Sequence, residues 1–178
     1  IEPSEEHYYQ PAWTLVGVLN IGKPVGRRCL IKAGADLIAI VQSGFVPMSA
    51  VLPIDQSQQL GVAISSKIDK AVNDATRLYS GVYGWQPILY PRKNMLLFNV
   101  PIAANLTMHQ YVFNTTTRAA CRFKGMNANC WGLLNDEWYF VGISGSVFKA
   151  DTTDADAGAN IVTDCFQAFS YFGAPNRA

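Results

Sequence analysis

Three stretches of the chain repeat one pattern, in which short apolar segments are separated by turn residues. The stretches span residues 28–49, 85–117 and 129–151. In each, three apolar segments alternate with turns that contain Gly, Asn or Asp, residues that supply the positive φ of tight hairpins. Such turns join neighbouring antiparallel strands. We therefore predict a mainly β protein built from antiparallel meander sheets.

The spacing of these stretches is typical of a propeller-like repeat. Asn94 and Asp136 begin the second strands of successive units and lie roughly 42 residues apart, as in four-stranded propeller blades. Units this small cannot bury an apolar face alone, so neighbours must stack, and fewer than four blades do not close a ring. We expect a single β-rich module that is part of a larger propeller-like protein. Its blade-like units are expected at about 28–49, 85–117 and 129–172.

The turns of the three units can be assigned individually. The first turns are expected at Gly34–Asp36, Arg92–Asn94 and Asn135–Asp136, and the second at Ser43–Gly44, the longer segment 101–109, and Ser144–Gly145.

One amphipathic helix is predicted as an insertion between the first two units, within residues 64–80. Ser66 and Asp69 have the spacing of an N-terminal capping box, and Gly81 is a natural stop. We expect the apolar stripe to pack on the protein's own sheet, although a partner-docking helix is an alternative. The stripe recurs at near-helical spacing in Ile64, Ile68, Val72, Ala75 and Tyr79.

The composition allows a real core and offers little sign of a charged partner. The chain is 49% hydrophobic and 15% charged, which argues against disorder. The net charge is +1 and no basic run exceeds Arg27–Arg28, so composition alone does not mark a nucleic-acid binder. A ring of subunits would still need only a few basic residues per copy to line a DNA channel. No apolar run reaches the length of a membrane span, so none is expected. The start at Ile1 suggests a processed or truncated chain.

Metal-binding and catalytic patterns are scarce. Cys29, Cys121, Cys130 and Cys165 form no CxxC pair, and we expect free, buried thiols. His7 and His109 are far apart in the sequence. The run GISGS at 142–146 has the wrong spacing for a nucleophile elbow and indicates a turn. We predict no catalytic residues, no cofactor and no bound metal, and hence no enzymatic activity.

Two further groups of residues have both a functional and a structural interpretation. Asp151, Asp154 and Asp156 could attract calcium, but they do not match an EF-hand loop, so a solvated loop is favoured. Triplets at Asn105 and Asn114 match the glycosylation pattern, which matters only in a eukaryotic secreted chain. Aromatic residues at strand positions could stack on sugars, although core packing is the commoner use; they are Trp85, Trp131, Trp138, Tyr139 and Phe140.

The chain resembles propeller-like virion proteins of tailed bacteriophages over most of its length, from Arg27 to Gly173. The resemblance rests on many ordered matches in the runs GRRCLIKAGADLIAIVQSGFVPMS, GWQPILYPRKNMLLFNVPI and QYVFNTTTRAACRFKGMNANCWGLLNDEWYFVGISGSVFKADTTDADAG, ending in AFSYFG. The chain departs from the family pattern at Thr117–Ala120, where Gly-Ala-Trp is usual, and at Met126, where Trp is common.

This resemblance implies a structural component of the phage tail, such as a hub, nozzle or adaptor, made in the bacterial host cytoplasm. The implied partners are other tail or portal-vertex proteins and further copies in a homo-oligomeric ring, with non-specific contact to the exiting DNA. The alternative is a carbohydrate-binding propeller module of a secreted or host-attachment protein. Hydrolysis of carbohydrate would need a pair of carboxylates, and Glu137 beside Trp138 is a single candidate.

Overall fold

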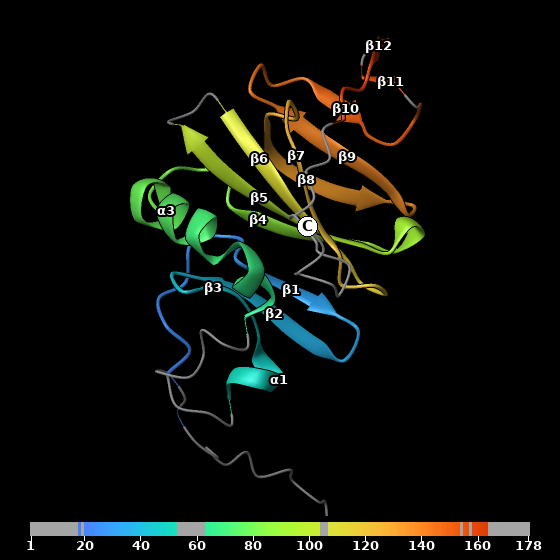
Figure 1. The fold of residues 1–178 in the computed structure, drawn as a ribbon. Coiled ribbons are helices and arrows are strands. Elements are labelled where there is room, and N and C mark those ends of the chain that lie inside the picture. Colours follow the sequence, from blue (N-terminus) through green and yellow to red (C-terminus); the bar gives the residue numbers. More distant parts are fainter. Residues whose placement is uncertain are drawn as a thin grey trace, which may run out of the picture.

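The computed structural model describes residues 18, 20–52, 63–103, 107–153, 155–156 and 158–163. The protein is mainly β, with antiparallel sheets and few helices, as the sequence predicts. Three sheets follow one another along the chain, and a small hairpin comes after them (Figure 1). Among the described residues, no helix is both long enough and apolar enough to span a membrane.

The first sheet is a three-stranded meander with the order β1-β2-β3. Its strands are β1 (Leu30–Ala33), β2 (Asp36–Val41) and β3 (Gly44–Pro47), and the short helix α1 (Met48–Val51) follows directly. Gly34 has a φ of 65° in the first turn, where the sequence places a tight hairpin. The meander predicted for residues 28–49 is confirmed.

A helix lies between the first and second sheets, inside the predicted range 64–80, but it begins differently. The 3₁₀ segment η2 (Ile64–Ile68) leads into the helix α3 (Asp69–Tyr79). The expected capping box at Ser66 is wrong, because Ile68 occupies the N-cap position and no side chain caps the helix. The neighbouring Ser65 is buried, and its hydroxyl accepts a hydrogen bond from the backbone N–H of Phe45 at 3.0 Å. These residues therefore attach the segment to the first sheet.

The middle sheet has four strands in the order β4-β5-β6-β7. The segment 101–109 was expected to be a long turn, but it is largely strand, with residues 104–106 outside the described part. The fourth strand was not predicted. The strands are β4 (Gln86–Tyr90), β5 (Met95–Ala103), β6 (Thr107–Asn114) and β7 (Ala120–Phe123), with the 3₁₀ turn η3 (Pro91–Lys93) after β4.

The third sheet is another three-stranded meander, with the order β10-β9-β8. Asn135 and Asp136 have φ values of 51° and 60°, which suits a tight two-residue hairpin between β8 and β9. The C-terminal run CFQAFSYF at 165–172 has a partly alternating pattern that fits a long outer strand or a helix, with a strand favoured; it lies outside the described residues. The strands are β8 (Ala128–Leu134), β9 (Glu137–Gly142) and β10 (Val147–Lys149), followed by the hairpin β11 (Ala155–Asp156) and β12 (Ala159–Asn160).

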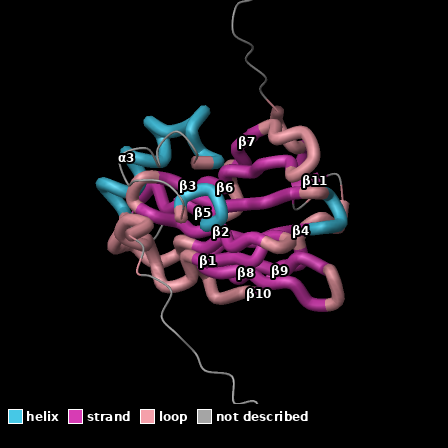
Figure 2. The backbone as a smooth tube through the Cα atoms, turned by 90° about the horizontal axis from the view of Figure 1, so that it is seen from below, coloured by secondary structure: helices cyan, strands magenta, loops and turns pink. Residues whose placement is uncertain are grey.

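The three sheets stack as layers, with the middle sheet buried on both faces (Figures 1 and 2). Successive residues of β5 point to opposite faces. Phe98 therefore packs with Phe45 of the first sheet, with ring centroids 3.9 Å apart, while Leu97 belongs to the cluster shared with the third sheet. Val72 and Ala75 of α3 join the first cluster, as expected for a helix packed on its own sheet.

We expect Phe98→Ala to destabilise the protein by about 3–5 kcal/mol, because it leaves a cavity between two layers. Phe98 is fully buried and stacks on Phe45. Denaturant unfolding followed by circular dichroism measures the change. Leu78→Ala is the control, since Leu78 is 61% exposed and its loss should change stability by less than about 0.5 kcal/mol. Equal effects of the two substitutions would contradict this layered packing.

Candidate functional site

The first strands of the three sheets border one groove of about 500 Å³. Strands β1, β4 and β8 are each the edge strand of their own sheet, and β4 lies beside both of the others. An edge strand exposes backbone N–H and C=O groups that have no ladder partner. Pro87 lies on the β4 edge, where its missing N–H does not interrupt the ladder with β5. The groove is therefore lined by three strand edges.

The charged residues that line this groove are Arg27 and Arg28, immediately before β1. Nη1 of Arg28 lies 3.4 Å from Oε1 of Gln86, a long hydrogen bond to a neutral group. No ion pair joins either arginine to a carboxylate within the described residues. The groove thus carries positive charge without a matching carboxylate and is suited to attract an anion.

A row of three carboxamide side chains crosses the middle sheet on the face that meets the third sheet. Gln86, Asn99 and Gln110 are direct neighbours on β4, β5 and β6, and we call them the carboxamide row. Asn99 and Gln110 are buried. Nε2 of Gln110 donates to Oδ1 of Asn99 at 2.8 Å, so two members of the row are bonded to each other.

The carboxamide row holds the backbone that leads into and along β8. Nδ2 of Asn99 donates to the carbonyl of Ala128 at 2.7 Å, and Nε2 of Gln110 donates to that of Met126 at 2.7 Å. Gln86 binds Trp131 twice: its amide donates to the Trp131 carbonyl at 2.9 Å and accepts from the Trp131 N–H at 3.2 Å. Gln86 thereby bonds to β8 as a neighbouring backbone peptide group would.

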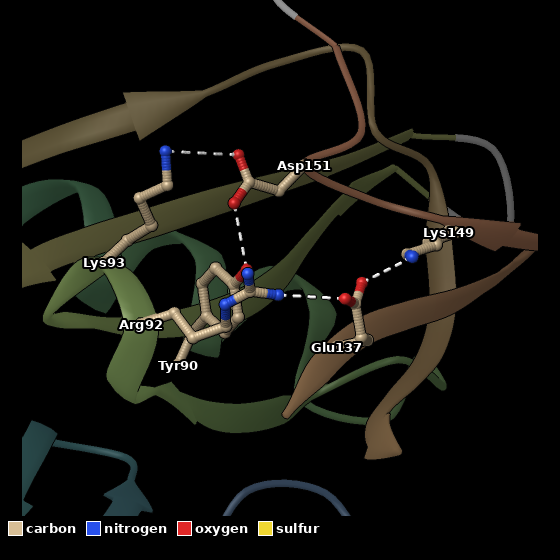
Figure 3. A network of polar contacts seen from close by, with 6 residues as sticks. All are labelled: Tyr90, Arg92, Lys93, Glu137, Lys149 and Asp151. Carbon is tan, nitrogen blue, oxygen red and sulfur yellow. Dashed lines mark hydrogen bonds and ion pairs between the residues drawn. The ribbon is translucent and has the colours of Figure 1, made fainter. Parts of the chain in front are cut away.

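A charged cluster joins the same two sheets at the η3 turn (Figure 3). Glu137 on β9 is bonded to Arg92 at 2.9 Å and to Lys149 on β10 at 2.6 Å. Hydrogen bonding to Lys149, and then to Arg92, lowers the pKa of Glu137. On the other side of the turn, Asp151 accepts a hydrogen bond from the Tyr90 hydroxyl at 2.9 Å.

Lys93 completes this second half of the cluster, with its Nζ 3.6 Å from Oδ1 of Asp151. Burial and the hydrogen bond to Asp151 raise the pKa of the Tyr90 hydroxyl. Both carboxylates are therefore partnered by cations. The cluster fastens the two sheets together and does not resemble an acid–base pair.

The histidines and cysteines singled out in the sequence do not form a site in the described part of the chain. His7 and Cys165 lie outside it. His109 is half-buried on β6, and burial, followed by the charges of Arg122 and Lys124, lowers its pKa. Cys29, Cys121 and Cys130 are free, but the expectation that they are buried is wrong: Cys121 is exposed and the other two are half-buried.

The acidic loop and the run GISGS at 142–146 were the other two candidates for a site in the sequence. Of the three aspartates, Asp151 belongs to the charged cluster, Asp154 lies outside the described residues, and the side chain of Asp156 is not described. No group of three potential metal ligands occurs among the residues that are described. The run 142–146 contains the last residue of β9 and the turn that leads to β10, with Gly145 at a φ of 83°.

The three tryptophans in the described part of the chain lie in the core, as favoured from the sequence. Trp85, Trp131 and Trp138 are buried, and the last two pack edge to face with centroids 5.7 Å apart. Tyr139 and Phe140 are half-buried. Of the two glycosylation triplets, the one at Asn105 begins outside the described residues. The side chain of Asn114 accepts hydrogen bonds from Thr116 N and Thr117 N and shapes the turn after β6.

Sequence reasoning missed the carboxamide row and the partners of Glu137. A Gln or Asn within a strand has no periodic signature, and the row forms only when β4, β5 and β6 are in register. For the charged cluster, the basic residues Arg92 and Lys93 in the η3 turn could have indicated that acidic partners lie close by. No protein-family model matches the chain, and comparison with curated proteins and with solved structures also finds no match.

We expect Asn99→Leu to destabilise the protein by about 2–5 kcal/mol. The substitution leaves buried carbonyls at Gly84 and Ala128 without their donor, and each unsatisfied group costs about 1–3 kcal/mol. Denaturant unfolding measures the loss. The matched control is Asn73→Leu on α3, which removes one hydrogen bond from a helix surface and should cost less than about 1 kcal/mol. A similar loss in both variants would show that the buried row has no special role.

The ion pairs of Glu137 should make stability depend on pH. Because its pKa is lowered in the folded protein, its contribution is present above the unfolded-state pKa and is lost as the pH falls through the folded-state pKa. Wild-type protein should therefore be more stable than Glu137→Gln at neutral pH, and the difference should vanish in acid. Unfolding at a series of pH values tests this, with Asp74→Asn on α3 as the exposed control. A difference that is independent of pH would contradict it.

Proposed function

We propose that the chain is a non-catalytic structural component of a bacteriophage virion, located in the tail and acting through protein assembly around the DNA path. In this proposal, the three sheets are consecutive blades of a propeller-like body. The observation that carries it is the common groove, because three stacked meanders present their first strands side by side at one edge. In a propeller, the strands nearest the axis are arranged in this way and line the central channel.

The charge of the groove supports a position next to nucleic acid. Arg27 and Arg28 line it without a carboxylate partner, although the whole chain has a net charge of only +1. Two guanidinium groups per copy would give weak and sequence-independent contact with phosphates, strengthened when several copies surround the DNA. Other tail or portal-vertex proteins, and further copies of the chain in a ring, are the proposed partners.

The alternative, a carbohydrate-binding module, has less support. Sugar binding commonly uses an exposed aromatic ring as a stacking surface, whereas Trp85, Trp131 and Trp138 are buried. Glu137 is ion-paired with Arg92 and Lys149, whereas hydrolysis of a glycosidic bond would need a second carboxylate facing it. The contacts of these residues favour a structural role.

The proposal predicts that the protein is part of purified phage particles at a fixed number of copies. Mass spectrometry of purified virions and electron microscopy with an antibody to the chain should find it at the tail, because a structural component stays with the particle. Empty heads that lack tails are the control and should not be labelled. A protein that is abundant in the infected cell but missing from purified virions would overturn the proposal.

A further inference from the structure

The stretch between Asp74 and Asp136 contains six basic residues and no acidic one. Three of the six, Arg77, Arg92 and Lys93, form ion pairs with carboxylates outside the stretch. The other three have no carboxylate partner among the described residues; they are Arg118, Arg122 and Lys124. Positive charge is therefore left unbalanced at these three positions.

The three unpaired residues lie along one edge of the middle sheet. β7 is the last strand of the order β4-β5-β6-β7, so it forms the edge opposite to the one that borders the groove. Arg122 is on β7, Arg118 is in the turn before it, and Lys124 follows it directly. All three residues are exposed. We call them the β7 basic edge.

The positive charges of the β7 basic edge are concentrated on one face of the sheet. Arg122 and Lys124 are two residues apart, which on a strand corresponds to one face and to a separation of about 7 Å, close to the spacing of successive phosphates in a nucleic-acid strand. His109 on β6 shares this face, because it is two residues from Tyr111, which is opposite Arg122. Burial, followed by the charges of Arg122 and Lys124, lowers the pKa of His109. Both cations therefore act on the same place.

The β7 basic edge lacks the apolar surface that a protein partner or a membrane would bury. None of the large apolar side chains that the described residues expose lies between Tyr83 and Leu133. Basic residues on an edge strand also oppose pairing with a further strand. A polyanion needs only cations and hydrogen-bond donors, and the exposed threonines at 115–117 add hydroxyl groups beside Arg118.

We propose that the β7 basic edge binds the phosphate backbone of a nucleic acid, without regard to base sequence. Each cation that contacts a phosphate releases counterions from the nucleic acid, so binding by this edge depends steeply on salt concentration. Three cations from consecutive parts of one hairpin can follow one strand of phosphates, whereas a single exposed lysine cannot.

This inference goes beyond the proposed function, in which the groove contacts DNA through Arg27 and Arg28. It concerns a different edge of the middle sheet and requires no phage tail. A protein that is missing from virions would remove the tail proposal and leave phosphate binding at β7 as it is. A virion protein that ignores DNA at β7 would do the reverse.

The test is the fluorescence anisotropy of a short labelled DNA duplex titrated with the full chain at several salt concentrations. Arg122→Gln/Lys124→Gln removes two phosphate contacts, so it should weaken binding at least about tenfold at low salt and reduce the slope of log affinity against log salt by about 2. The matched control is Lys67→Gln/Lys70→Gln, which removes the same charge from exposed positions near the start of α3. It should leave the salt slope unchanged.

Circular dichroism must show the same unfolding temperature for wild type and Arg122→Gln/Lys124→Gln, as expected for exposed side chains. If that variant unfolds, Arg118→Gln/Lys124→Gln replaces it with the same expectation. Equal losses in the test and control variants would mean that only the net charge matters, and would overturn the proposal. So would a wild-type chain that does not bind at low salt, or binding that is abolished by Arg27→Gln/Arg28→Gln and kept without the β7 cations. Displacement of the DNA by poly-glutamate at equal charge would assign the edge to acidic proteins instead.

Discussion

The hydrogen bonds of Asn99 and Gln110 determine where the third sheet sits on the middle one. Both side chains are buried, so their amide N–H groups need acceptors inside the protein. They donate to the backbone carbonyls of Met126 and Ala128, where the chain enters β8, while Oε1 of Gln110 has no partner among the described residues. A slip of that segment by one residue would break these bonds. Apolar packing is not directional, so these directional hydrogen bonds are what specify the register of this segment.

Burial of the middle sheet on both faces explains why its strands differ from the others. β5 is apolar at nearly every position because each face meets another layer. The third sheet packs one face on the middle sheet, and several of its apolar residues are half-buried or exposed. The position of the middle sheet in the stack is thus visible in how many residues of β5 are apolar.

Local chemistry accounts for the parts of the fold that the sequence predicted correctly. Asn135 and Asp136 adopt positive φ values that few other residues tolerate. The position of this hairpin could therefore be predicted from these two residues alone. The start of α3 was misplaced for the opposite reason. The buried hydroxyl of Ser65 bonds to β3, and a tertiary contact of this kind has no local signature. Strand β7 escaped prediction because it is short and mostly exposed, and so lacks an apolar pattern.

The groove is formed by the way the three sheets are stacked. Each sheet adds one strand edge to it, through β1, β4 and β8. A single chain offers Arg27 and Arg28 to an anion, and each phosphate contact contributes only a small increment to binding. In the proposed ring, each further copy of the chain would add its own pair of arginines, so the attraction for a polyanion would grow with the number of copies. The net charge of +1 of the whole chain is therefore compatible with the proposed contact to DNA, because a local pair of basic residues repeated in a ring would supply the positive charge.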